Sequence, residues 1–158
     1  MMRSNLILAF TPKFIWTACL ILALSLSNTA FSSAPHNVYL TATESDGIPL
    51  QQPATEFSCS DKIYAVIELS GLSREMHKLD AVWRDPHGKD REFTEYEFQA
   101  SNESERIWVW LKLHRPAEAA LVSFINPSAG MDEFIGKWEL HLAIDNEPLE
   151  TKSFSVLC

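Results

Sequence analysis

Two tryptophans that lie two residues apart are the side chains in this sequence best suited to bind a ligand. Trp108 and Trp110 alternate with aliphatic residues in the segment Arg106–Leu113, so they share one face if the segment is a strand. On a strand their rings lie about 7 Å apart and form a flat platform. Such a platform stacks on sugar rings or receives the apolar side chains of a protein partner.

Two further residues are candidates for the same ligand-binding platform. Tyr64 and His141 join it if their strands neighbour the strand that carries the tryptophans. In the alternative, both faces of the tryptophan strand are covered. A second sheet then covers one face, and the long connection 115–134 covers the other.

The residue pattern indicates no catalytic residue, no cofactor and no metal site. The sequence has no Gly-x-Ser-x-Gly motif, and 21 acidic residues make any one carboxylate pair uninformative about glycosidase chemistry. Two turns, Asp85–Asp90 and Asp145–Glu147, carry oxygen ligands of the kind that calcium prefers, but turns also favour Asp and Asn for backbone reasons. The histidines show neither His-x-His nor His-x-x-x-His spacing: they are His36, His77, His87, His114 and His141.

The N-terminus has the layout of a secretory signal peptide. Residues 1–34 contain no acidic residue; Arg3 and Lys13 precede an apolar run, Phe14–Leu26, and small and polar residues follow to position 34. The apolar run has 13 residues, whereas a membrane-spanning helix needs about 20. We therefore expect cleavage near 30–34, export to the periplasm or outside the cell, no stable membrane span after cleavage, and one domain from residue 35 to 158.

Charge and cysteine content fit an exported domain. Without Arg3 and Lys13, 11 basic residues remain against 21 acidic ones, a net charge of −10, which argues against a nucleic-acid partner and leaves an unknown protein or glycan. Cys59 and Cys158 remain after cleavage, and we predict that they form one disulfide. Two separate thiols are the alternative.

Residues after position 35 alternate with period two rather than with the period of a helix. Residues 45–58 are predicted to be an irregular connection, and residues 119–125 are compatible with an extra strand, a short helix or a buried loop. Cys59 begins the second predicted strand and Cys158 ends the seventh, so a simple up-and-down order brings both cysteines to one end. Seven strands are predicted: 38–42, 62–69, 77–84, 91–99, 106–113, 136–145 and 149–157.

The sequence resembles the immunoglobulin-like β-sandwiches of exported bacterial proteins. The resemblance lies in Trp83 on the third predicted strand and in a closing hairpin with Gly136-Lys137-Trp138, a polar turn and Phe154-Ser155-Val156. It implies an all-β fold of two antiparallel sheets with about seven strands. One departure is that the sixth strand has no cysteine, so the bridge would hold the C-terminus instead of joining the second and sixth strands.

These features favour a non-enzymatic binding or structural module of the cell envelope or the extracellular space. A carbohydrate-binding module that uses Trp108 and Trp110 is the main alternative, and a small exported hydrolase is a weaker one. Fold alone does not decide between them.

Overall fold

The computed structural model describes residues 35–100, 104–114 and 130–158. These residues all belong to one compact unit, Ser32–Cys158. The predicted signal peptide and the segment 119–125 lie outside the described residues.

All seven predicted strands are confirmed, with ends that differ from the expected ones by one or two residues. They form because alternating side chains place one apolar row toward the core and one polar row toward solvent. The strands are β1 (His36–Thr41), β5 (Lys62–Ser70), β6 (Met76–Arg84), β7 (Asp90–Gln99), β8 (Ser104–Lys112), β9 (Gly136–Ile144) and β10 (Glu147–Leu157).

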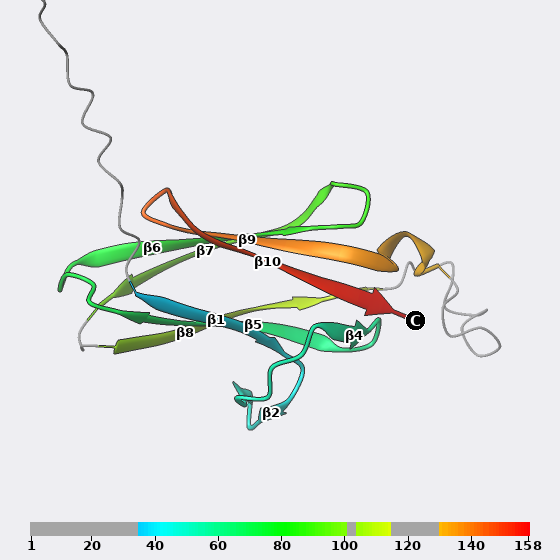
Figure 1. Ribbon diagram of the computed structural model, residues 1–158, viewed down its shortest axis with the longest axis horizontal. Coiled ribbons are helices and arrows are strands. Elements are labelled where there is room, and N and C mark those ends of the chain that lie inside the picture. The colour runs from blue at the N-terminus through cyan, green and yellow to red at the C-terminus, as the bar shows by residue number, and fades with distance from the viewer. Residues whose placement is uncertain (1–34, 101–103, 115–129) are drawn as a thin grey trace, which may run out of the picture. The chain divides into compact units, whose positions relative to one another are not determined.

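The strands form two stacked sheets, which confirms the predicted immunoglobulin-like sandwich (Figure 1). The three-stranded sheet has the order β1-β5-β8, and the five-stranded sheet has the order β4-β10-β9-β6-β7. Pairing is antiparallel except between β4 and β10. The chain changes sheet between β5 and β6, between β7 and β8, and again before β9, so strands that follow one another in the chain are not always paired.

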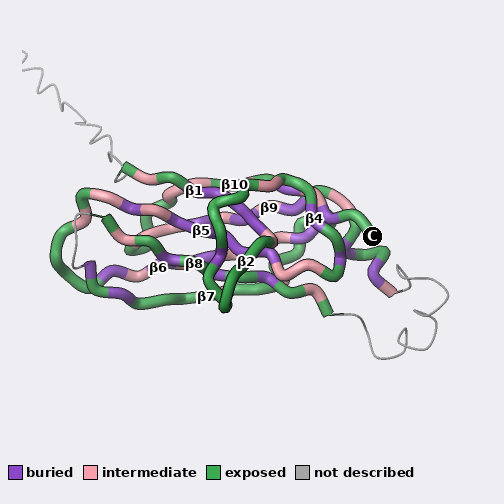
Figure 2. The backbone as a smooth tube through the Cα atoms, turned by 90° about the horizontal axis from the view of Figure 1, so that it is seen from below, coloured by how far each residue is buried: buried purple, intermediate pink, exposed green. Residues whose placement is uncertain are grey.

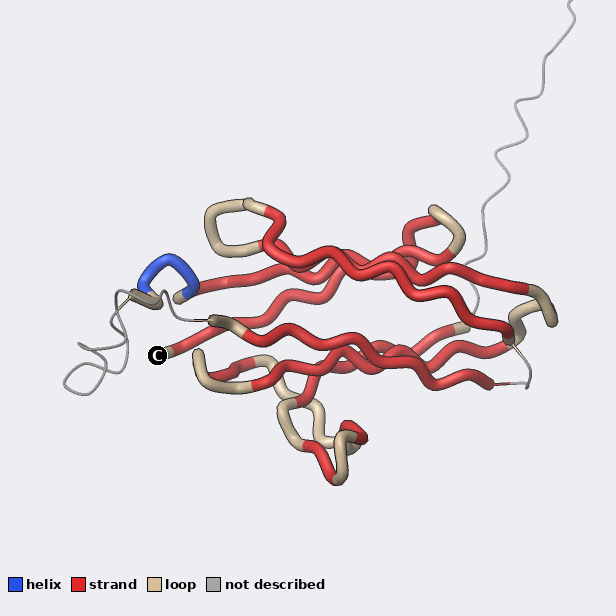
Figure 3. Tube along the Cα trace, turned by 180° about the vertical axis from the view of Figure 1, so that it is seen from behind, coloured by secondary structure: helices blue, strands red, loops and turns tan. Residues whose placement is uncertain are grey.

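The segment 45–58 is not wholly irregular, contrary to the prediction. It contains β3 (Ile48–Pro49), which pairs with β2 (Glu44–Ser45) as a separate small hairpin, and β4 (Glu56–Ser58), which joins the five-stranded sheet. Strands of two or three residues are too short to show an alternating pattern, so only their pairing reveals them. The small hairpin lies outside the three-stranded sheet (Figures 1 and 3). A 3-10 turn, η3 (Asp132–Phe134), precedes β9.

The predicted disulfide between Cys59 and Cys158 is present, with the two Cα atoms 5.2 Å apart. Both cysteines lie at one end of the sandwich, as expected, and the structure adds a closer link between them. The two cysteines follow β4 and β10, neighbouring parallel strands, and the Cys59 amide donates to the Leu157 carbonyl at 3.1 Å. The bridge therefore holds the C-terminal strand to a strand that the sequence pattern did not reveal.

Buried residues recur along the strands of both sheets (Figure 2), and their side chains form the core between the sheets. Trp83, Trp138 and Phe154 form an aromatic cluster from three strands of the five-stranded sheet, with ring centroids 5.8 and 6.1 Å from that of Phe154. Aliphatic side chains from the three-stranded sheet complete the core; the fully buried ones include Ile63, Ala65 and Ile67.

Candidate binding surface

Trp108 and Trp110 lie on the outer face of β8, the last strand of the three-stranded sheet. Their side chains are 38% and 50% exposed, whereas Ile107 and Val109, which alternate with them, face the core. They are opposite Val66 and Tyr64 of β5. Most of the connection 115–134, which was the alternative cover for this face, lies outside the described residues.

The hairpin of β2 and β3 covers the part of this face over β1 and β5. Arg106 donates from Nη2 to the Pro49 carbonyl at 2.7 Å and to the Tyr39 hydroxyl at 3.0 Å. Pro49, Tyr64 and Val66 are almost completely buried as a result. The tryptophans remain exposed because they lie on the outermost strand, beyond this cover.

Of the two further candidates, Tyr64 lies on the strand next to the tryptophans, as the prediction required, whereas His141 does not. Tyr64 is beside Trp110 but buried, and the Lys62 ammonium lies 4.7 Å and 4.8 Å from the ring centroids of Tyr64 and Trp110. His141 is on β9 in the other sheet, where its Nδ1 lies 3.1 Å from the Thr151 hydroxyl. Alternation assigns a residue to a face of its strand, but it does not say which sheet the strand joins.

Strand β7, which also carries aromatic residues, lies next to the tryptophans. We call the side of the sandwich formed by β7 and β8 the open side, because these strands end their sheets and no described strand pairs with their outer edges. Tyr96 on β7 and Met76 at the start of β6 are 49% and 61% exposed there. Sequence reasoning missed Tyr96, because acidic residues interrupt the alternation of β7. The sequence signal that could have revealed Tyr96 is that this strand carries three aromatic residues among many acidic ones.

Two hollows run along the open side between β7 and β8. Their volumes are about 670 Å³ and about 220 Å³, and Tyr96 and Trp108 line both. Three glutamates, Glu92, Glu97 and Glu105, contribute to the walls, against one cation, Arg106. The surface therefore combines aromatic rings with negative charge.

Ser73, His77 and Asp145 have the residue types of a hydrolase triad, but the hydrogen bonds indicate another role. His77 Nδ1 lies 2.7 Å from Asp145 Oδ2, and its Nε2 lies 3.0 Å from the Ser73 carbonyl oxygen and 3.4 Å from the Ser73 hydroxyl. A carboxylate and a carbonyl only accept, so both ring nitrogens of His77 carry hydrogens. The hydrogen bond with Asp145, then that with the Ser73 carbonyl, raises the pKa of His77. A general base needs an unprotonated nitrogen facing the serine, which this arrangement lacks.

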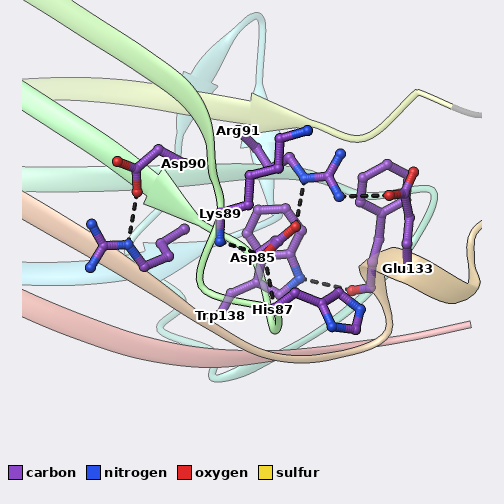
Figure 4. Close-up of polar contacts among 9 residues, drawn as sticks. Asp85, His87, Lys89, Asp90, Arg91, Glu133 and Trp138 are labelled. Atoms are coloured by element: carbon purple, nitrogen blue, oxygen red, sulfur yellow. Dashed lines mark hydrogen bonds and ion pairs between the residues drawn. The ribbon is translucent and has the colours of Figure 1, made fainter.

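The turn Asp85–Asp90 holds a network of hydrogen bonds at the opposite end of β6 (Figure 4). Buried Asp85 accepts at Oδ1 from the amides of His87 and Lys89, both at 2.9 Å, and at Oδ2 from Arg91 Nε at 2.6 Å. Burial opposes ionisation of Asp85, but these donors outweigh it and lower its pKa. Arg91 also donates to Glu133 at 2.6 Å. The Asp85 carboxylate therefore stabilises the turn, rather than facing an open site as a calcium ligand would.

Comparisons with known proteins find similarity in architecture alone. No helix in the described residues is long and apolar enough to cross a membrane. No protein-family model matches the chain, and no curated protein matches it in sequence.

Among solved structures, the chain is similar to a CARDB domain from Pyrococcus furiosus in complex with di-metal ions, with 8% identity, a TM-score of 0.41, and coverage of 81% of this chain and 97% of that one. It is also similar to a β-glucosidase from Listeria innocua in complex with glucose, with 8% identity, a TM-score of 0.44, and coverage of 78% of this chain. The chain spans only 16% of that β-glucosidase. With TM-scores below 0.5, these likenesses assign neither a substrate nor a partner to this chain.

Proposed function

We propose that the protein is an exported, non-catalytic binding module whose recognition surface is the open side. The exposed apolar side chains gathered there support the proposal: Met76, Tyr96, Trp108 and Trp110 are all more than a third exposed. Large apolar residues grouped on a soluble surface usually mark a binding site, and Tyr and Trp contribute most to such interfaces. Export is supported by the signal-like N-terminus and by the disulfide, which persists in oxidising compartments.

A glycan ligand is the second candidate. Trp108 and Trp110 present two rings on one face of β8, the arrangement that stacks on successive sugars. Trp110 is half exposed even though Lys62 lies over its ring. A protein partner is favoured because Tyr96 and the acidic hollows extend the surface beyond the two tryptophans.

Capture from native envelope extract tests the open side as a recognition surface. We expect a Tyr96→Ala/Trp110→Ala variant to lose the partner that the parent protein retains. Leu157→Ala, which removes a side chain that is 52% exposed at the end of β10, is the matched control and should retain it. Equal retention by all three proteins, each shown to be folded, would contradict the proposal. A glycan array then separates a sugar ligand from a protein one.

A further inference from the structure

At the open side, the five-stranded sheet extends beyond the three-stranded sheet. Leu79, Ala81 and Trp83 of β6 face the core and are completely buried. Tyr96 on β7 is opposite Leu79 and faces the same way, yet it is 49% exposed. The inner face of β7 therefore extends past β8, and no described strand of the three-stranded sheet lies over it. Antibody constant domains place a fourth strand at the corresponding position.

The edge of β8 is suited to receive such a strand. β8 spans nine residues, Ser104–Lys112, and pairs only with β5 among the described strands. A strand end of a sheet exposes a row of backbone donors and acceptors that can template another chain. A strand added beside β8 would lie over Tyr96 and would have Trp108 and Trp110 next to its outward side chains.

The charge of the open side indicates which kind of chain binds at the edge of β8. The hollows beside β8 are lined by three glutamates and one arginine, and the chain after residue 34 carries a net charge of −10. Lys62 and Arg106 lie over the rings of Trp110 and Trp108, so an added strand meets the negative charge on the side of the hollows and not beside the tryptophans. A second copy of this protein would bring more negative charge to an acidic surface. A segment with lysine or arginine side chains complements the surface instead.

We propose that an extended, cationic segment of a partner protein adds as a fourth strand to the edge of β8 with which no described strand pairs. Its inward side chains contact Tyr96 and Glu92, and its outward side chains lie beside Trp108 and Trp110. Backbone hydrogen bonds supply the pairing, and the alternating side chains supply selectivity. This inference rests on the proposed binding function of the open side and specifies its partner.

Selection from a random dodecapeptide display library on the disulfide-bonded protein tests the charge of the occupant. We expect enriched peptides in which lysine or arginine alternates with apolar residues. Their affinity should fall about tenfold or more for Glu92→Lys/Glu97→Lys, because each reversal replaces attraction with repulsion. Glu56→Lys/Glu147→Lys makes the same charge change on β4 and β10, away from the open side, and should leave the affinity within about twofold. Enrichment of acidic or neutral peptides, or no enrichment, would overturn the proposal.

Amide hydrogen exchange of the protein with and without an enriched peptide tests strand addition. Alternate residues of β8, whose amides point away from β5, should become protected on binding, because only these amides can pair with an added strand. Protection of the same amides in the free protein would show that the edge is already paired and would overturn the proposal. If binding is lost in Tyr96→Ala/Trp110→Ala but β8 gains no protection, the added strand is wrong while the open side remains the recognition surface. Peptide binding that stays intact in both the Glu92→Lys/Glu97→Lys variant and the Tyr96→Ala/Trp110→Ala variant would contradict the inference and the proposed function together.

Discussion

His77 joins the turn after β5 to the hairpin between β9 and β10. Burial opposes ionisation of its partner Asp145, but the hydrogen bonds from His77 and from the Lys78 amide outweigh it and lower the pKa of that carboxylate. Both shifts favour the charged form of the pair. Its contribution to stability requires a protonated His77 and an ionised Asp145.

Stability should decrease as the pH rises through the raised pKa of His77. The folded protein holds this proton more tightly than the unfolded chain does, so the contribution is complete below pH about 6.5 and is lost above the folded-state pKa. Urea unfolding of the parent between about pH 5.5 and 8.5 should show the decline, and His77→Gln should flatten it. His87→Gln, which changes an exposed turn histidine, should keep the parent profile. A parent curve that rises through this range would contradict the assignment.

Asp85 is expected to contribute far more to the stability of the fold than Asp90, at the other end of the same turn. Asp85→Asn removes a buried charge that faces Arg91 and should lower the free energy of unfolding by about 2–3 kcal/mol. Asp90→Asn breaks an exposed ion pair with Arg84, which solvent and salt screen, and should lower the free energy of unfolding much less. Urea denaturation of the two variants measures both values. Equal losses would show that burial of Asp85 does not set its contribution.

The connections between strands depend on backbone conformations that few residues adopt. Asp145 and Asn146 have φ values of 53° and 67°, as a two-residue turn between twisted antiparallel strands requires. The predicted short hairpin between the last two strands is thus confirmed. At the start of β9, Gly136 has a φ of 134°, and a Cβ there would lie 3.2 Å from Pro86. This close approach joins the β6–β7 turn to β9.

Two glycine substitutions should therefore differ in cost. Gly136→Ala combines an unfavourable φ with a collision against Pro86 and should destabilise by about 2–4 kcal/mol. Gly88→Ala has a φ of 78° with open space around the added Cβ, so only the conformational cost of about 1 kcal/mol applies. Thermal unfolding should rank the variants in this order. The reverse ranking would show that the contact with Pro86 relaxes without cost.

For the whole molecule, the disulfide closes a loop between residues 99 positions apart. A cross-link of that span reduces the entropy of the unfolded chain, so Cys59→Ser/Cys158→Ser should lower the free energy of unfolding by about 4–5 kcal/mol. Mass spectrometry should find the oxidised parent about 2 Da lighter than its reduced form. In reducing agent, the parent and the variant should have the same free energy of unfolding. A variant as stable as the oxidised parent would show that closing this loop does not stabilise the fold.

The sequence by itself determined the seven long strands and the inward face of most of them, because both follow from alternation within a few residues. It also predicted that Cys59 and Cys158 are bonded, from their even number after a signal-like segment. Only the tertiary structure decided which strands share a sheet. This places His141 away from Trp110 and Tyr96 beside Trp108, and it reveals β4 as the partner of the C-terminal strand. Strand pairing depends on hydrogen bonds between residues far apart in the chain, and a local pattern of side chains carries no information about them.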